Sequence, residues 1–477
     1  MSKKFGANRR RVLQWSLGAA STSIAGFPLV AWAADQKWKA KYDVAVIGGG
    51  NSGLCAALEA AHSGKKVLVV QAQPILGGNS ALSTGWFTCV NSPVQLKLSQ
   101  IKDSPEQFYK DSMAISGGLR DPVWTRIVAE NSGADIAWLQ EQGVEFENIV
   151  EASMGSTIPR AIQAKGYGGA VVRAIAKRLE ETKKADVLVE ARCRDLITRS
   201  NRIAGISVQT ATGKDNYACN SVVLASGGWV HNKELVARYL RPEYRNLQAV
   251  GVPQNVGDGL LMALKAGAAT QHMDQVLVVP TTDKATRIYL TSGALAGGGI
   301  LVNEKGERFT NELEGYTQTS LAMLKQKVVY EIVVPECHTK VQDLIDKDMI
   351  QRADSVADLA KKINVPEGNL QKEIDAHNAA TRGEIKDRFG RTIYKNQLRA
   401  PFYFLSVMPT SLISLGGVRI NDKAAVVNDK GKPALPGLYA VGEVASGYRD
   451  GGYRTGDSMM FCVVSGRIAG KQASLVD

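Results

Sequence analysis

The stretch Tyr42-Asp43-Val44-Ala45-Val46-Ile47-Gly48-Gly49-Gly50-Asn51-Ser52-Gly53-Leu54-Cys55-Ala56-Ala57 decides the fold of this chain. Its apolar run over 44–47 is typical of a strand that is buried on both faces of a parallel sheet. Gly48, Gly50 and Gly53 then have the spacing G-x-G-x-x-G, and an Ala-rich helix is expected over 54–62. Glycines at this spacing permit a tight turn, a close backbone approach to a pyrophosphate, and close packing of helix on strand. Because the free N–H groups at a helix start attract a diphosphate, the stretch predicts a dinucleotide site.

Two further segments extend this site along the chain. A second strand is predicted over 66–70, at βαβ spacing, and Gln71 ends it. Dinucleotide folds usually place an acid there for the adenosine ribose, and Gln71 can still hydrogen-bond a hydroxyl. A loop of small and hydroxyl residues follows over 76–85, and it is suited to backbone contact with a flat ring.

The rest of the chain predicts an α/β fold with an insertion. Patterns before residue 273 indicate helices over 104–143, 168–182 and 255–266, and strands over 187–190, 203–208 and 221–228. Between 273 and 405 the pattern changes to a hairpin over 301–309 and exposed helices over 354–364 and 367–382. Strand and glycine patterns return from 416, and a helix over 458–474 closes the chain. We therefore expect a Rossmann-like nucleotide-binding domain split into 34–272 and 406–477, with an α+β cap over 273–405 inserted between the two parts.

The composition and the amino-terminal segment indicate which class of protein this chain is. The chain has 477 residues, 44% hydrophobic and 22% charged, as an ordinary globular protein does. Arg9-Arg10-Arg11, an apolar run to Val30 and Ala31-Trp32-Ala33 together predict a Tat export signal over 1–33 and a periplasmic location. A membrane anchor is the alternative, but the apolar stretch is short and contains Ser and Gly. Five of the twelve excess positive charges lie in this segment, which has no acid, so the remainder carries +7.

That modest excess favours acidic small molecules or an acidic partner, and no basic stripe with aromatics predicts nucleic-acid binding. The six cysteines form no CxxC or CxxCH motif, so neither a zinc site nor an attached c-type haem is expected. We predict mostly buried free thiols, no metal, and no membrane span after cleavage of the signal.

Four segments together resemble the FAD-dependent flavoprotein family of soluble fumarate reductases, urocanate reductases and 3-ketosteroid 1-dehydrogenases. They are the Gly48 loop, Gly77-Gly78-Asn79-Ser80, the stretch 303–312 (N-E-K-G-E-R-F-T-N-E) and 437–443 (G-L-Y-A-V-G-E). The resemblance implies FAD in a split domain, a mobile cap, and substrate held between cap and flavin. It also implies that Glu443 contacts the ribose or ribityl chain. The full set of predicted cofactor contacts is Gly48, Gly50, Asn51, Ser52, Gly53, Gln71, Gly77, Gly78, Asn79, Ser80, Ser226, Gly227, Asp258, Glu443 and Ser458. Because no His stands in the loop 77–85, the FAD is expected to be non-covalent.

The chain departs from the fumarate reductase pattern at the positions that bind and protonate a dicarboxylate. The family pattern has histidines where this chain has Val279 and Leu412-Ile413, and a proton-donating Arg where it has Tyr316. Tyr316 is instead what the ketosteroid dehydrogenases show, and Tyr453 lies near their second essential Tyr, although their Tyr-Pro-Gly tail is absent. Arg454 lines up with the carboxylate-clamping Arg of the fumarate reductases.

These residues suggest how the reaction would run. A flavin transfers hydride while the protein positions the substrate and moves the proton. We predict Tyr316 as proton donor or acceptor, Arg454 as an anion clamp, and Tyr453 as a donor that activates a carbonyl. The alternatives are packing roles for the two tyrosines and a structural ion pair of Arg454 with Asp457 or Asp450. Thr291 and Ser292 are possible substrate contacts.

The expected function is a periplasmic FAD-dependent reductase of C=C bonds in a small carbonyl- or carboxylate-conjugated substrate, with Tyr316 in place of the usual Arg. Its electrons would come from a separate partner such as a c-type cytochrome or a quinol-linked protein. A ketosteroid-dehydrogenase-like dehydrogenase and a flavin electron-transfer subunit without substrate chemistry are the alternatives.

Overall fold

The computed structural model describes residues 37–98, 101–151 and 158–477. The predicted export signal over 1–33 lies outside these residues. Within the described part of the chain, no helix has both the length and the apolar character needed to cross a bilayer.

A parallel five-stranded sheet forms the centre of the larger part of the molecule. Its spatial order is β18 (Leu438–Ala440), β10 (Ser221–Leu224), β2 (Val44–Ile47), β3 (Val67–Val70) and β6 (Ala185–Leu188). β2, β3 and β10 are buried along their whole length, because helices cover one face and a second sheet covers the other. The unbroken apolar run that predicted β2 is therefore explained by burial on both faces.

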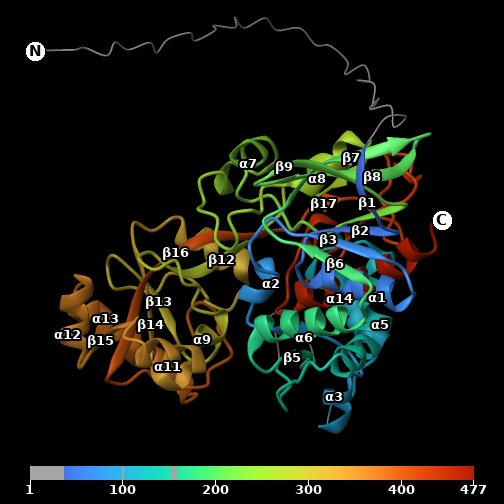
Figure 1. The fold of residues 1–477 in the computed structure, drawn as a ribbon. Helices are drawn as coiled ribbons and strands as arrows, with labels where there is room; N and C mark the ends of the chain where they lie inside the picture. Colours follow the sequence, from blue (N-terminus) through green and yellow to red (C-terminus); the bar gives the residue numbers. More distant parts are fainter. Residues whose placement is uncertain (1–36, 99–100, 152–157) are drawn as a thin grey trace, which may run out of the picture.

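Helices α1 (Asn51–His62), α5 (Pro122–Glu141), α6 (Tyr167–Glu181) and α14 (Asp457–Ser474) lie on one side of this sheet (Figure 1). The other side carries an antiparallel ladder of β7 (Arg192–Arg199), β8 (Arg202–Thr210) and β9 (Gly213–Ala218), with β1 (Trp38–Lys41) parallel to β9. α1 and α14 pack closely because glycines face the partner helix: a Cβ on Gly466 would lie 2.4 Å from the carbonyl oxygen of Ser52.

The remaining elements of this part are short and surround the sheet. They are α2 (Gly78–Leu82), β4 (Trp86–Thr88), α3 (Pro93–Lys97), α4 (Pro105–Ile115), β5 (Ala161–Gln163), α7 (Lys233–Tyr239), η2 (Pro242–Tyr244), α8 (Asp258–Lys265), β11 (Thr270–Gln271), β17 (Gly417–Val418) and η4 (Gly442–Val444).

The region 104–143, predicted to be helical, contains two helices, α4 and α5. Each has its own start signal, since Ser104 and Asp121 cap the backbone and Pro105 and Pro122 occupy the first turn. Gly117 and Gly118 have positive φ angles in the connection, which an uninterrupted helix could not accommodate.

The second part of the molecule has its own antiparallel sheet and its own apolar core. The sheet has the order β12 (Val276–Asp283), β16 (Phe402–Ser414), β14 (Val329–Val333) and β13 (Ile300–Asn303), and β15 (Gln351–Ala353) also pairs with β16. Around it lie α9 (Ser292–Ala296), α10 (Tyr316–Met323), η3 (Pro335–Cys337), α11 (Thr339–Asp346), α12 (Val356–Ile363) and α13 (Glu367–Thr381). The core is built from residues between Leu290 and Val407, and β12 and β16 join this part to the rest (Figure 1).

The expected hairpin over 301–309 forms only in part. β13 pairs with β14, and the segment after it returns through a turn with a single bridge between Val302 and Arg308. Asn303 closes this turn because its side-chain oxygen accepts from the N–H groups of Lys305 and Glu307.

The cysteine prediction is confirmed. All six thiols are free, and those of Cys55, Cys89, Cys193, Cys219 and Cys337 are buried, whereas Cys462 is half-buried.

Candidate active site

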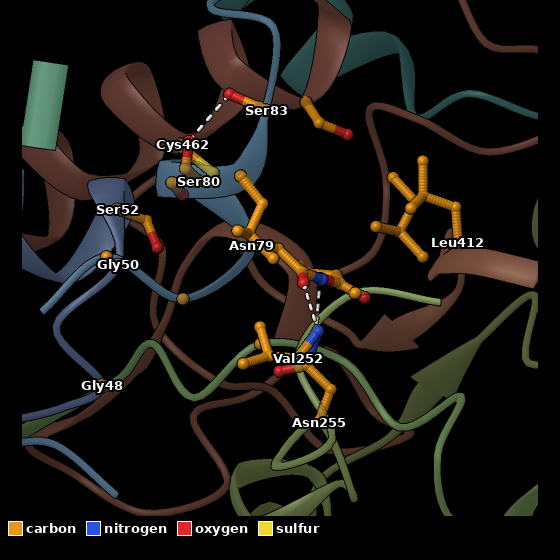
Figure 2. Close-up of a pocket in the computed structure, with 18 of the residues that line it drawn as sticks. Gly48, Gly50, Ser52, Asn79, Ser80, Ser83, Val252, Asn255, Leu412 and Cys462 are labelled. Carbon is orange, nitrogen blue, oxygen red and sulfur yellow. Dashed lines mark hydrogen bonds between the residues drawn. The ribbon is translucent and has the colours of Figure 1, made fainter. Parts of the chain in front are cut away.

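A cavity of about 500 Å³ runs from the glycine loop after β2 to the junction with the cap. Figure 2 shows Gly48, Gly50 and Ser52 at one side of it, Asn79, Val252 and Asn255 near its middle, and Leu412 at the other side. The cavity therefore has a glycine-rich end and an end that contains residues of β12, α10 and β16.

The glycine loop has the geometry that a pyrophosphate site requires. Gly48 has a φ of +114°, a conformation that favours glycine. A Cβ on Gly53 would lie 1.9 Å from the carbonyl oxygen of Gly48, so only glycine lets α1 begin this close to β2. Gly50 is the N-cap of α1, and no side chain caps this helix start. Apart from the N–H of Asn51, which donates to the hydroxyl of Ser80, the N–H groups of the first turn are therefore available to an anion at the cavity wall.

The loop after β3 lies against this turn. Gly50 and Gly77 form a parallel bridge, and the hydroxyl of Ser80 accepts a hydrogen bond of 3.1 Å from the N–H of Asn51. Asn79 reaches across the cavity: its oxygen accepts from the N–H of Val252 at 2.9 Å, and its amide donates to Glu443 at 3.3 Å.

Glu443 is half-buried in a polar position in the cavity wall. Its carboxylate accepts from the N–H of Ser414 at 3.1 Å and from the amide of Asn255 at 3.5 Å. Burial raises the pKa of Glu443 above its ordinary value, and the positive charge of Arg449 and the donors Ser414 and Asn79 oppose that rise. A carboxylate in this place can accept from hydroxyl groups of a bound ligand.

The other predicted contacts lie around the same end. The side-chain oxygen of Gln71 accepts from the N–H of Gly49 at 3.0 Å. Asp258 forms a two-point ion pair with Arg192, at 2.6 and 2.9 Å. Of the predicted cofactor contacts, these line the cavity: Gly48, Gly50, Ser52, Gln71, Gly77, Gly78, Asn79, Ser80, Ser226, Gly227, Asp258, Glu443 and Ser458.

Asn51 and Gly53 support the cavity from behind and do not line it. Asn51 is fully buried, and its side chain donates to the carbonyl of Met459 at 3.5 Å. This contact joins the start of α1 to the start of α14.

Two phenols occupy the cap end of the cavity. The rings of Tyr316 and Tyr453 meet edge to face, with centroids 6.1 Å apart. The Tyr316 hydroxyl lies 2.9 Å from the hydroxyl of Ser292 and 3.4 Å from that of Thr455. Burial raises the pKa of Tyr453, so this phenol stays protonated and can act as a hydrogen-bond donor.

The wall around the phenols is apolar. Leu277 and Val279 come from β12, and Leu412 and Ile413 come from the facing strand β16. Together with Tyr289 they form a small cluster separate from the two large cores. This end is therefore suited to a flat, largely uncharged group.

Arg454, predicted as an anion clamp that faces the substrate, does not line the cavity in this structure. Its guanidinium is fully buried, 3.3 Å from Asp457 and 2.6 Å from the hydroxyl of Ser112, and it stacks on Phe108. Neighbouring side chains in the non-helical segment before α14 point in opposite directions, so Tyr453 faces the cavity and Arg454 faces the interior. The alternative weighed for Arg454, a structural ion pair with Asp457, matches these contacts.

Several cavity residues escaped the sequence analysis. Tyr289, Arg287 and Arg192 line it, as do residues 250–252. Tyr289 and Arg287 lie in the turn after β12, and only the pairing of β12 with β16 brings this turn to the site. The aromatic and basic residues of that turn were the sequence feature that could have indicated a role in the site.

The model of the family described as "FAD binding domain" matches residues 43–458. The chain belongs to this family. Its glycine loop, the start of α1 and the half-buried acceptor Glu443 fit FAD, since they offer N–H groups to a diphosphate and an acceptor to sugar hydroxyls. The family confirms FAD as the cofactor and the expected fold, a Rossmann-like domain with a cap.

Known members agree with this assignment. A NADH:fumarate oxidoreductase of Klebsiella pneumoniae is 28% identical over 91% of this chain and 48% of its own length, so the chain spans about half of that protein. A probable fumarate reductase of Shewanella frigidimarina is 30% identical over 90% of this chain and 74% of its own. The open conformation of a flavocytochrome c3 fumarate reductase superposes with a TM-score of 0.79 at 29% identity, over 92% of this chain and 79% of that one. These likenesses confirm the resemblance drawn from the sequence and the class of FAD-dependent oxidoreductase.

Within the described residues, no group of three or more His, Cys, Asp or Glu side chains is arranged to hold a metal ion.

Proposed function

We propose that this protein reduces a C=C bond conjugated to a carbonyl group in a small, largely apolar substrate, and that Tyr316 supplies the proton. The observation that carries the proposal is the Tyr316 hydroxyl at the cap end of the cavity, 2.9 Å from Ser292 and beside the ring of Tyr453. That end is continuous with the glycine-rich end that fits FAD.

When bound and reduced by the electron donor, FAD would supply a hydride to one carbon of the double bond. Tyr316 gives its hydroxyl proton to the other carbon, so the C=C bond becomes a C–C bond with two new C–H bonds. Ser292 and Thr455 lie within reach of the Tyr316 oxygen, and they can donate to the phenolate that proton transfer leaves. Tyr453, protonated because it is buried, donates to the carbonyl oxygen and draws electron density from the double bond.

The wall residues favour a substrate with a conjugated carbonyl group over a dicarboxylate substrate. The histidine positions of the fumarate reductase pattern are occupied here by Val279, Leu412 and Ile413, which are apolar and line the cavity. The expected clamp, Arg454, is engaged with Asp457. A substrate whose reacting end is neutral fits this surface best.

The reverse reaction, dehydrogenation, would use the same groups, with Tyr316 as proton acceptor. Among the described residues, no carboxylate or other strong base lies hydrogen-bonded to Tyr316 to take up its proton. This supports the reducing direction.

The proposal also includes the setting of the reaction. The sequence over 1–33 supports export to the periplasm. A protein electron donor follows from that setting, and the similarity to a flavocytochrome makes a separate c-type cytochrome the first donor to test, ahead of a quinol-linked protein.

Tyr316→Phe tests the proposed role, because it removes the transferable proton and keeps the ring. We expect turnover to fall by about 10²- to 10⁴-fold, since that is the usual contribution of a positioned proton donor. The assay uses holoprotein with reduced viologen and a panel of enones and unsaturated acids.

The bound flavin absorbance should be unchanged in Tyr316→Phe, which separates loss of chemistry from loss of cofactor. Tyr330→Phe is the matched control, because Tyr330 lies on β14 in the cap and does not line the cavity. Turnover near the wild-type rate in Tyr316→Phe would exclude this residue as the proton donor.

A further inference from the structure

Three arginines line the cavity, and they differ in what already binds them. Arg192 is paired with Asp258 through two hydrogen bonds. Arg449 is fully buried and donates to backbone carbonyls, including that of Ala445 at 2.7 Å. Arg287 is exposed, and the one hydrogen bond of its guanidinium among the described residues is to the thioether sulfur of Met408, at 3.3 Å. Among the described cavity residues, Arg287 is thus the cation without a carboxylate or carbonyl partner.

The backbone of Arg287 is held in a conformation that costs free energy. Its φ is +63°, in the left-handed region that a branched or long side chain rarely adopts. Asp283 fixes the turn: its carboxylate accepts from the N–H of Thr286 at 2.7 Å, and its carbonyl accepts from the N–H of Arg287 at 3.0 Å. Non-glycine residues in this region concentrate at ligand-binding sites, where surrounding contacts hold them in place.

The turn lies at the end of the ribbon that walls the cavity. Thr282 pairs with Met408 across β12 and β16, and the same ribbon carries Leu277, Val279, Leu412 and Ile413 into the cavity. Arg287 is therefore placed at the mouth of the cavity, beyond the apolar wall.

We propose that Arg287 recognises a carboxylate at the end of the substrate remote from the reacting double bond. This deepens the proposed function and rests on it: the substrate is an amphipathic unsaturated acid, whose conjugated carbonyl lies at the phenols and whose carboxylate stays at the mouth. A guanidinium can bind a carboxylate through two parallel hydrogen bonds, which gives both affinity and orientation.

Binding can be measured without turnover. The saturated probes 6-oxoheptanoate and its methyl ester differ only in the charge of the remote end. Each is titrated into holoprotein, and the change in the flavin absorbance spectrum gives the dissociation constant. We expect wild-type protein to bind the acid more tightly than the ester. Arg287→Met should raise the dissociation constant of the acid by about tenfold and change that of the ester by less than about twofold.

Two variants serve as controls. Lys284→Met removes an exposed positive charge from the same turn at a residue that does not line the cavity, and it should match wild type. Arg287→Lys keeps the charge without the two-pronged geometry, and it should recover part of the preference.

Equal effects of Arg287→Met on acid and ester, an unchanged acid affinity, or no binding of either probe to wild type would each overturn the proposal. Its failure is distinguishable from failure of the proposed reaction. Reduction of 6-oxohept-4-enoate methyl ester that depends on Tyr316, without an acid preference, would remove only the role of Arg287. An acid preference in protein whose turnover does not depend on Tyr316 would remove only the proposed proton transfer.

Discussion

At the scale of the residue, adjacent side chains in one short segment have different tasks. Tyr453 faces the cavity, whereas Arg454 enters a buried cluster in which two guanidiniums share one carboxylate. Asp457 lies 2.5 Å from Arg120 and 3.3 Å from Arg454, and all three are fully buried. Burial alone would raise the pKa of Asp457, but the two arginines hold it below its ordinary value.

This cluster predicts that Asp457→Asn is far more damaging than Arg454→Met. The first change leaves two buried guanidiniums without a counter-charge, which costs about 3–5 kcal/mol. The second leaves a one-to-one pair of Arg120 and Asp457, so we expect a loss of under about 2 kcal/mol. Thermal midpoints of the two purified variants give the comparison. If Arg454→Met instead kept its stability and raised the Michaelis constant for an acid, the clamp role would be restored.

At the scale of the element, the start of α1 depends on how closely it approaches β2. We predict that Gly53→Ala lowers the fraction of chains that retain FAD, because the added Cβ would meet the carbonyl oxygen of Gly48 at 1.9 Å. Overpacking of this kind costs about 1–3 kcal/mol, and here the strain falls on the turn that fits the diphosphate.

Gly368→Ala is the matched control, since Gly368 also lies in a first helical turn and a Cβ there has no neighbour within 4 Å. Flavin absorbance per chain measures the retention. Full retention in Gly53→Ala would show that the turn can shift without loss of the site.

At the scale of the whole molecule, a titratable contact joins two segments that are far apart in the sequence. His272, just before β12, lies 2.8 Å from Asp450, which is fully buried near the segment that carries Tyr453. The hydrogen bond to Asp450 raises the pKa of His272 above its ordinary value of 6.5. Protonated His272 therefore stabilises the folded protein below about pH 6.5, and this stabilisation is lost as pH rises through the higher folded-state pKa.

We accordingly predict that wild type exceeds His272→Gln in thermal stability by about 1 kcal/mol near pH 6, and that the difference shrinks toward pH 9. Melting curves at several pH values provide the measurement, and His62→Gln, at an exposed position on α1, is the control. A difference that grows with pH would show that the neutral imidazole is the stabilising form.

The sequence by itself determined the parallel sheet, the cofactor loop and most of the residues around it. These features are local: the apolar run of β2, the glycine spacing and the loop over 77–80 each act within a few residues of one another. The family resemblance singled out Tyr316 and Tyr453, and both line the cavity; their catalytic roles stay predictions.

Only the tertiary structure decided which side of its segment Arg454 faces and which cation remains free at the cavity mouth. Both depend on contacts between distant parts of the chain: Arg454 meets Ser112 on α4, and the turn of Arg287 meets Met408 on β16. In an irregular segment the sequence has no regular repeat that shows which side chains face the same way. The spacing of residues therefore could not predict the direction of either arginine. The direction is set by burial and charge pairing, which exist only once the two parts of the molecule have packed together.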